Sequence, residues 1–98
     1  MNITKKQNGS ALEFALEGRL DTATAPELEQ EVKTGLDGVT ELTFNFENLE
    51  YISSAGLRVL LTAKKRLHGI GPVKVTHCNE MVKEVFAVTG FDQILTLE

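Results

Sequence analysis

The sequence predicts an α/β domain in which a mixed β-sheet of four to five strands packs against three or four helices. Segments of alternating apolar and polar residues, typical of half-buried strands, take turns along the chain with segments in which apolar residues recur every three or four positions, typical of helices. A hairpin comes before this alternation. Because strand–helix–strand units place strands parallel and a hairpin places them antiparallel, the predicted sheet is mixed.

The chain opens with the predicted hairpin. Residues 11–17 alternate apolar and polar side chains, which indicates a strand with one buried face. Residues 2–7 are its expected partner, and we place the connecting turn at Asn8 and Gly9, because this pair favours a tight hairpin turn.

A helix follows, and its start is marked in the sequence. Thr24 and Glu27 have the spacing of a capping box, and Pro26 lacks an N–H that would be unpaired in a first turn. Apolar residues then recur every four positions, and Gly35 and Gly38 end the helix.

The second half of the chain repeats the alternation. Residues 41–46 form the third predicted strand, and leucines from 57 to 67 mark a second helix with basic residues in its last turn. Residues 73–76 are a short strand, Asn79 caps a third helix that ends at Gly90, and residues 94–97 are a last strand. We expect thirteen apolar side chains to form the core: Leu12, Phe14, Leu16, Leu28, Val32, Phe44, Phe46, Leu57, Leu60, Leu61, Val82, Val85 and Phe86.

Composition narrows the class of protein. The 98 residues are enough for a single domain, 1–98, and the hydrophobic fraction of 42% is ordinary for a globular protein. A net charge of −4 argues against direct nucleic-acid binding. No apolar run has the length of a membrane span, and the first residues lack a signal-peptide core. With a single cysteine, Cys78, the composition favours a cytoplasmic protein.

The most informative segment is the turn between the third strand and the second helix. Ser53 and Ser54 follow the strand-like apolar segment, and the small residues Ala55 and Gly56 begin the helical pattern. This order places a serine hydroxyl at a helix N-terminus, where unpaired amides and the helix dipole favour negative charge. A phosphate on that serine would be stabilised by the helix that carries it.

Three short motifs resemble those of the STAS domains of anti-sigma factor antagonists. Residues 18–21, Gly-Arg-Leu-Asp, look like the family's Gly-x-Leu-Asp at the entrance to the first helix. Residues 49–57 look like its phosphorylation-site loop, and residues 89–91, Thr-Gly-Phe, like the tripeptide that closes its last long helix. The order of the predicted elements is also similar to the STAS fold over essentially the whole chain.

This resemblance implies a function. Family members bind an anti-sigma factor that is also a serine/threonine kinase, and so release a sigma factor. The kinase phosphorylates the loop serine and breaks the complex, and a serine phosphatase restores it. Carried onto this chain, the phosphoacceptor is Ser54, while Ser53 and Asn45 stand where many members have Asp. The implied partner-binding residues are Asp21, Thr22, Ser53, Ser54, Ala55 and Gly56.

Other interpretations of these residues remain beside this one. Ser53 and Ser54 are also good helix caps and need no further role. A second function for the same fold is an accessory or ligand-binding STAS module of a transport complex. A hydrolase is disfavoured, because the nucleophile elbow Gly-x-Ser-x-Gly requires a glycine where Ile52 stands.

Residues for catalysis, cofactors or metals are not apparent. His77 and Cys78 are adjacent, so on an extended strand their side chains would point to opposite faces, and no second pair supplies further ligands. The glycines lack the spacing of nucleotide-binding loops. We therefore expect a binding module that is not an enzyme and has no catalytic residue, cofactor or metal.

Overall fold

The computed structural model describes all residues, Met1–Glu98, and has the predicted order of strands and helices. Three helices and a short 3-10 turn connect five strands of one sheet. The elements are β1 (Asn2–Asn8), β2 (Ala11–Leu20), α1 (Ala25–Thr34), β3 (Glu41–Ile52), α2 (Ser54–Arg66), β4 (Val73–Thr76), α3 (Glu80–Thr89), η1 (Phe91–Gln93) and β5 (Thr96–Leu97). None of the helices is long and apolar enough to cross a membrane.

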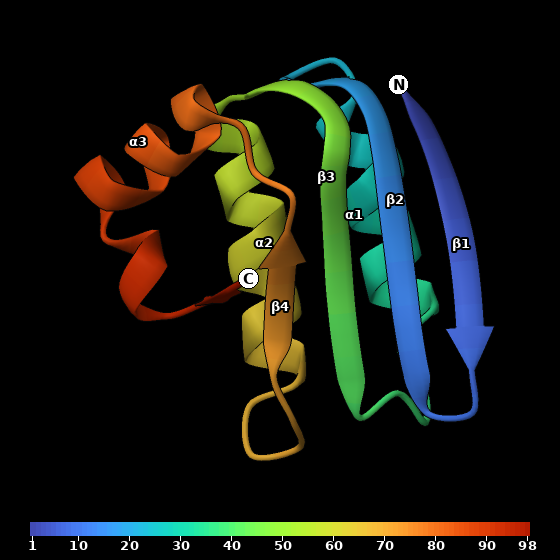
Figure 1. The fold of residues 1–98 in the computed structure, drawn as a ribbon. Helices are drawn as coiled ribbons and strands as arrows, with labels where there is room; N and C mark the ends of the chain where they lie inside the picture. The colour runs from blue at the N-terminus through green and yellow to red at the C-terminus, as the bar shows by residue number, and fades with distance from the viewer.

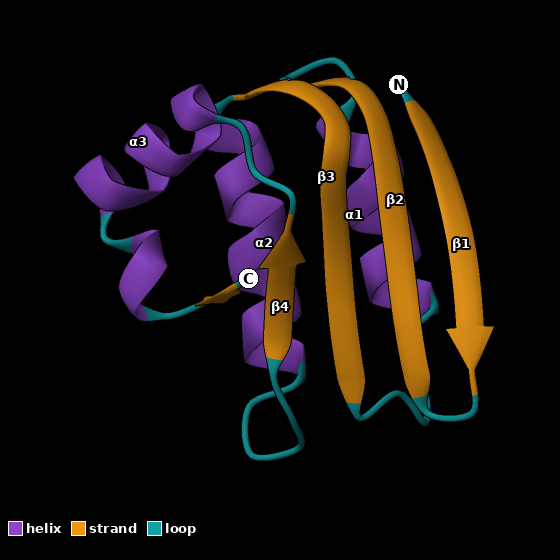
Figure 2. Ribbon diagram, in the orientation of Figure 1, coloured by secondary structure: helices purple, strands orange, loops and turns teal.

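The strands lie in the sheet in the order in which they occur in the chain. β1 pairs antiparallel with β2, and each later strand pairs parallel with its predecessor, so the predicted mixed sheet is confirmed. α1 and α2 lie side by side behind β2, β3 and β4, and α3 lies beyond β4 (Figure 1). The opposite face of the sheet carries no helix, as Figure 2 shows most clearly. β3 is the third of the five strands and occupies the centre of the sheet.

The hairpin turn is one residue later than predicted. Asn8 pairs with Ala11, so the loop consists of Gly9 and Ser10. Gly9 has a φ of 62°, and Ser10 does not have a positive φ. A positive φ at the first central residue alone is typical of a type II′ turn, which needs glycine at that position. Gly9 thus sets the turn, and Asn8 belongs to β1.

β3 is twice as long as the predicted strand 41–46. Its burial alternates up to Phe46 and then resumes at Leu49 and again at Ile52. Ala15 pairs with Asn45 and Glu17 with Asn48, so β3 has one residue more than β2 in this interval. A second extra residue follows before Tyr51, which pairs with Arg19. These two bulges bend β3 and end the period-2 pattern on which the prediction rested.

The ends of the other predicted strands also shift. β2 continues to Leu20 instead of ending at residue 17, with Gly18 at a φ of 107° inside the strand. The predicted last strand 94–97 is reduced to the two residues of β5, because the amides of Ile94 and Leu95 bond back to the Phe91 carbonyl of the 3-10 turn. The boundaries of β4 and α3, and the end of α3 at Gly90, match the prediction.

One contiguous core lies between the sheet and the helices. Its 24 buried residues form a single cluster, in which Phe14, Phe44, Phe46 and Phe86 are fully buried. The ring centroids of Phe44 and Phe46 lie 6.4 Å apart, and those of Phe46 and Phe86 lie 6.3 Å apart. This row of phenylalanine rings runs from the centre of the sheet to α3 and joins that helix to the core.

Eleven of the thirteen predicted core residues are buried; the other two, Leu61 and Val85, are half-buried. Leu61 lies one position further around α2 than Leu60, which is fully buried. Val85 packs against the core from the rim of α3. Both lie at the border of a helix face, where a pattern of apolar residues does not distinguish core from rim.

Replacing Phe86 with alanine should destabilise the domain by about 3–5 kcal/mol, because the substitution leaves a cavity at the end of the phenylalanine row. Chemical denaturation measures this loss. Val88→Ala is the matched control, since Val88 lies on the same helix and is 81% exposed, and it should change stability by less than about 0.5 kcal/mol. Equal losses for the two variants would contradict the packing described.

Candidate functional site

Three loops meet at one edge of the sheet, where the parallel strands β2, β3 and β4 end. The backbone N–H of Ser53 donates to the carbonyl of Leu20 at 2.9 Å and joins the first two loops. The side-chain amide of Asn79 donates to the carbonyl of Leu49 at 3.1 Å and joins the third. The carboxyl edge of parallel strands is where α/β proteins commonly place their functional loops. The residues of the predicted contact set, Asp21 to Thr22 and Ser53 to Gly56, all come from this edge.

Ser53 is the N-cap of α2. Its backbone is extended, with φ −100° and ψ 176°, and its hydroxyl oxygen accepts a hydrogen bond from the Gly56 amide at 3.4 Å. Its carbonyl accepts from the Leu57 amide at 3.0 Å, the first bond of the helix. Ser53 therefore has the structural role that the capping interpretation assigned to it.

Ser54 is the first residue of α2 and is exposed. The first turn of the helix contains no acidic residue. Ser54 therefore presents its hydroxyl to solvent beside the positive end of the helix dipole. Its role as a phosphoacceptor stays a prediction from the resemblance.

Gly56 allows α2 to approach the ends of β2 and β3. A Cβ atom at this position would lie 2.7 Å from Cγ of Leu20 and 2.8 Å from Cγ1 of Ile52. Both contacts are shorter than carbon atoms tolerate, so the first turn of α2 can rest on Leu20 and Ile52 only if residue 56 has no side chain. This steric requirement explains the glycine that follows the two serines and Ala55.

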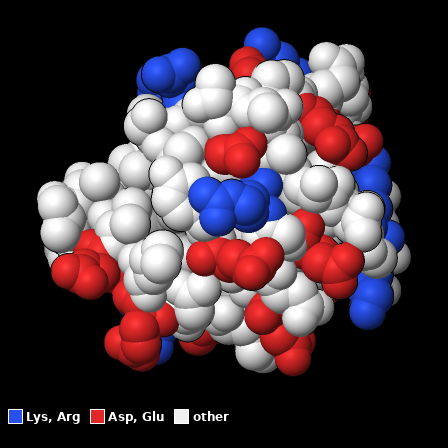
Figure 3. Space-filling view, turned by 90° about the horizontal axis from the view of Figure 1, so that it is seen from above, with Lys and Arg blue, Asp and Glu red and all other residues white.

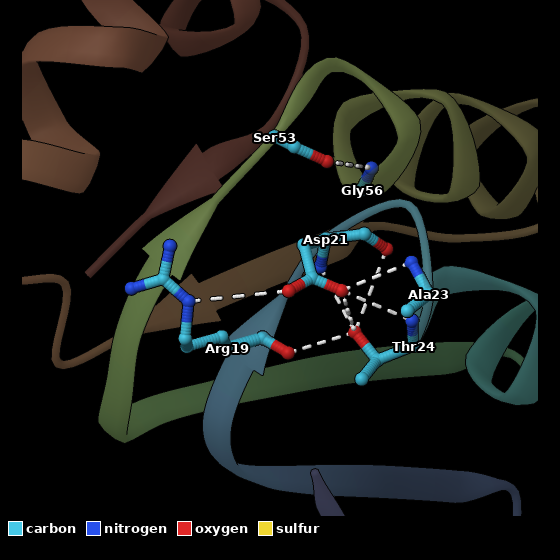
Figure 4. A network of polar contacts seen from close by, with 6 residues as sticks. All are labelled: Arg19, Asp21, Ala23, Thr24, Ser53 and Gly56. Carbon is cyan, nitrogen blue, oxygen red and sulfur yellow. Dashed lines mark hydrogen bonds and ion pairs between the residues drawn. The ribbon is translucent and has the colours of Figure 1, made fainter.

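The loop between β2 and α1 is organised by Asp21 (Figure 4). One carboxylate oxygen, Oδ1, accepts from the backbone amides of Ala23 at 3.0 Å and Thr24 at 3.1 Å. The Thr24 hydroxyl donates to the carbonyl of Arg19 at 2.7 Å and accepts from the Asp21 amide at 2.9 Å. Asp21 thus holds the turn that leads into α1.

The predicted capping box between Thr24 and Glu27 is wrong. Thr24 is the N-cap residue of α1, but its φ and ψ of −99° and −22° are helical and its side chain makes no capping hydrogen bond. Its hydroxyl is already bonded to the backbone of β2 and of the loop that follows it. The Glu27 amide donates to the Thr24 carbonyl at 3.1 Å instead of to the Thr24 side chain.

Hydrogen bonding also lowers the pKa of Asp21. The largest cause is the bond from the Thr24 amide, which favours the charged carboxylate, and a smaller one is Arg19. Nε of Arg19 lies 3.9 Å from Oδ2 of Asp21, and the guanidinium lies 4.4 Å from the centre of the Tyr51 ring. The Asp21 carboxylate is thus held ionised at the centre of this loop.

Acidic side chains predominate at this end of the molecule. Figure 3 shows it from above, with a central group of basic atoms, several acidic groups around it and further basic groups at the margin of the view. Glu47 and Glu50 of β3 and Glu80 of α3 are among the exposed acidic residues of these elements. The edge therefore carries a negative field that a further phosphate would strengthen.

A shallow groove of about 220 Å³ runs between α1 and α2 beside this edge. Thr22 lines it from the loop before α1, Pro26 from α1, and Ala55 and Arg58 from α2. Two residues of the predicted contact set, Thr22 and Ala55, thus face one groove. No group of three or more His, Cys, Asp or Glu side chains is arranged to hold a metal ion.

Gly56→Ala should destabilise the domain by about 1–3 kcal/mol, because the new Cβ overlaps Leu20 and Ile52. In an unhindered helix the same change would stabilise by up to about 1 kcal/mol, so the sign of the effect tests the contact. Urea denaturation measures it, and combining Gly56→Ala with Leu20→Ala should cost less than the sum of the two changes. A gain in stability for Gly56→Ala would contradict the close approach.

Asp21→Asn should make the stability of the domain less sensitive to acid. A lowered pKa in the folded state means that Asp21 contributes stability above its unfolded pKa of about 3.9, and that this contribution is lost as the pH falls through the folded pKa. Urea denaturation between about pH 7 and pH 3 should show a shallower acid-side slope for Asp21→Asn than for the unchanged chain. Asp37→Asn, at an exposed position outside this loop, should keep the original slope. Identical slopes for Asp21→Asn and the unchanged chain would contradict the role of Asp21.

Two named relatives align over nearly the whole chain. BtrV, a candidate anti-sigma factor antagonist of Bordetella bronchiseptica, is 34% identical over 93 residues, which are 93% of this chain and 80% of BtrV. The anti-sigma-B factor antagonist of Staphylococcus aureus is 29% identical over 98 residues, which are 97% of this chain and 90% of that protein. Neither name refers to a transport complex.

Solved structures share the fold. The anti-sigma factor antagonist SpoIIAA in its unphosphorylated form superimposes with a TM-score of 0.79 at 18% identity, covering 99% of this chain and 87% of SpoIIAA. The phosphorylated form of this Bacillus cell fate determinant gives a TM-score of 0.78 at 19% identity, covering 99% and 91%. The profile of the STAS domain family matches residues 2–98. The chain therefore belongs to the STAS domain family.

Proposed function

We propose that this chain is an anti-sigma factor antagonist and that phosphorylation of Ser54 switches off its contact with the anti-sigma factor. The single observation that carries the proposal is the exposed Ser54 at the first position of α2, in a STAS domain whose relatives are named anti-sigma factor antagonists. The exposure leaves the hydroxyl open to a kinase, and the position places it among the other residues of the predicted contact set.

The proposed partner is a serine/threonine kinase that is itself the anti-sigma factor. The proposed contact set on this chain is Asp21, Thr22, Ser53, Ser54, Ala55 and Gly56, of which Gly56 is buried and supports the first turn of α2. The support is spatial, because the backbone bond between Ser53 and Leu20 ties the two loops together and Thr22 and Ala55 line the same groove. Binding of this surface would occupy the anti-sigma factor and release a sigma factor in the cytoplasm.

Phosphorylation would act through local electrostatics. The kinase transfers the γ-phosphoryl group of ATP to Oγ of Ser54, ADP leaves, and the hydroxyl proton passes to a base of the kinase. The ester brings a charge of about −1.5 to −2 to an edge at which acidic side chains already predominate. Desolvating this charge in the interface opposes docking without any change of fold. A serine phosphatase would hydrolyse the ester and restore binding, and the chain itself would act by binding alone.

Three variants test the switch against the purified anti-sigma factor kinase of the same host. Ser54→Ala should bind as tightly as the unmodified chain and should not be phosphorylated, because it removes only the acceptor oxygen. Ser54→Asp should bind about tenfold or more weakly, because it places a permanent negative charge in the interface. Calorimetry measures the affinities, and mass spectrometry measures the phosphate.

Ser53→Ala is the matched control at the neighbouring serine. It should cost about 1 kcal/mol of folding stability through loss of the cap, while Ser54 is still phosphorylated. Phosphate transfer to Ser53 in place of Ser54 would refute the proposal. So would an affinity of Ser54→Asp equal to that of the unmodified chain.

A further inference from the structure

We infer that Arg58 binds the phosphate of phosphorylated Ser54, in an ion pair formed within α2. The inference rests on the proposed function, because it takes Ser54 as the phosphoacceptor. Arg58 would hold the modified side chain over the first turn of the helix, and the ion pair would change the charge of the contact surface.

Spacing on the helix brings the two side chains together. Ser54 is the first residue of α2, Arg58 follows four positions later, and both are exposed. Residues at i and i+4 are neighbours on one helix face, with Cβ atoms about 5–6 Å apart. The order is also favourable, since an anion on the N-terminal side of a cation agrees with the helix dipole.

Arg58 is free to take this partner. It forms no ion pair, although Arg19, Arg66, Lys33 and Lys74 each have a carboxylate within 4.0 Å. The first turn of α2 contains no acidic residue. Glu29 of α1 lines the same groove as Arg58, but the Glu29 carboxylate is paired with Lys33 at 2.9 Å. A guanidinium without a partner therefore lies one turn beyond the phosphoacceptor.

The start of α2 offers further hydrogen-bond donors. The Gly56 amide donates to Oγ of Ser53 and the Leu57 amide to the Ser53 carbonyl, whereas the amides of Ser54 and Ala55 have no acceptor within the chain. A phosphate on Ser54 has three acceptor oxygens, and a guanidinium has paired donors suited to them. These amides and Arg58 would hold the phosphate against the helix.

The ion pair changes two features of the contact surface at once. In the unmodified chain the edge presents an exposed, unpaired Arg58 on the wall of the groove beside Ser54. In the phosphorylated chain this cation is neutralised by the phosphate, and a net negative charge remains. Phosphorylation thus removes a positive group from the reach of a partner as well as adding a negative one.

A phosphate titration tests the pair directly. Phosphoserine is placed at position 54 by genetic encoding, so that no host kinase is needed, and the phosphate resonance is followed by 31P NMR against pH. The second pKa of the phosphate should lie below its ordinary value of about 6, because Arg58 favours the dianion. Arg58→Gln should raise this pKa by roughly 0.3 or more, and Arg58→Lys should raise it less.

Two control variants separate this pair from a general charge effect. Lys65→Gln removes the same charge from an exposed position of α2 further along the helix and should leave the phosphate pKa unchanged. Arg19→Gln removes a cation at the end of β2 and should also leave the phosphate pKa unchanged, because Arg19 is engaged with Asp21 and Tyr51. An equal phosphate pKa with and without Arg58, or a rise with Arg19→Gln alone, would overturn the inference. Neither result would depend on whether the host kinase uses Ser54.

Discussion

The parallel pairing of β2 and β3 is the constraint on which the site depends. Both strands end at the same edge, where the Ser53 amide bonds to the Leu20 carbonyl at 2.9 Å. α2 then begins directly on the Leu20 side chain, and this is possible because Gly56 has no Cβ. The same pairing therefore fixes where the loop of Asp21 lies, where α2 starts and which serine faces solvent. Without this pairing, the loops that follow β2 and β3 would not be held at the same surface.

The sequence was sufficient to predict the order of the elements, but not the length of the central strand. Hydrophobic periodicity located β4 and α3 well, because in both the pattern and the cap residues agree. It failed after Phe46 because two bulges shift the buried face of β3, and a bulge has no period of its own. One sign of the first bulge is Asn45, whose side-chain oxygen accepts from the Glu47 amide at 3.0 Å. That role becomes visible only once the register is known.

Some features of the site could be predicted from the sequence and others could not. Two serines followed by small residues and a leucine repeat predicted a helix that starts at Ser54, since cap preference and steric need agree there. The capping box at Thr24 was wrong because the Thr24 hydroxyl is bonded to the Arg19 carbonyl and the Asp21 amide, and the Glu27 amide donates to the Thr24 carbonyl instead. Arg58 was missed because its significance lies in having no carboxylate partner, which requires every neighbouring element to be placed. Spacing from Ser54 was the only signal for it in the sequence.

The claim that Ser54 is the phosphoacceptor can be tested on the chain isolated from its own host under conditions in which the kinase is active. Tandem mass spectrometry of the peptide that spans the end of β3 and the start of α2 can assign a phosphate to one of two adjacent serines. We expect a single phosphate on Ser54, the exposed residue, with the capping Ser53 unmodified. A phosphate on Ser53, or on another residue while Ser54 stays unmodified, would contradict it.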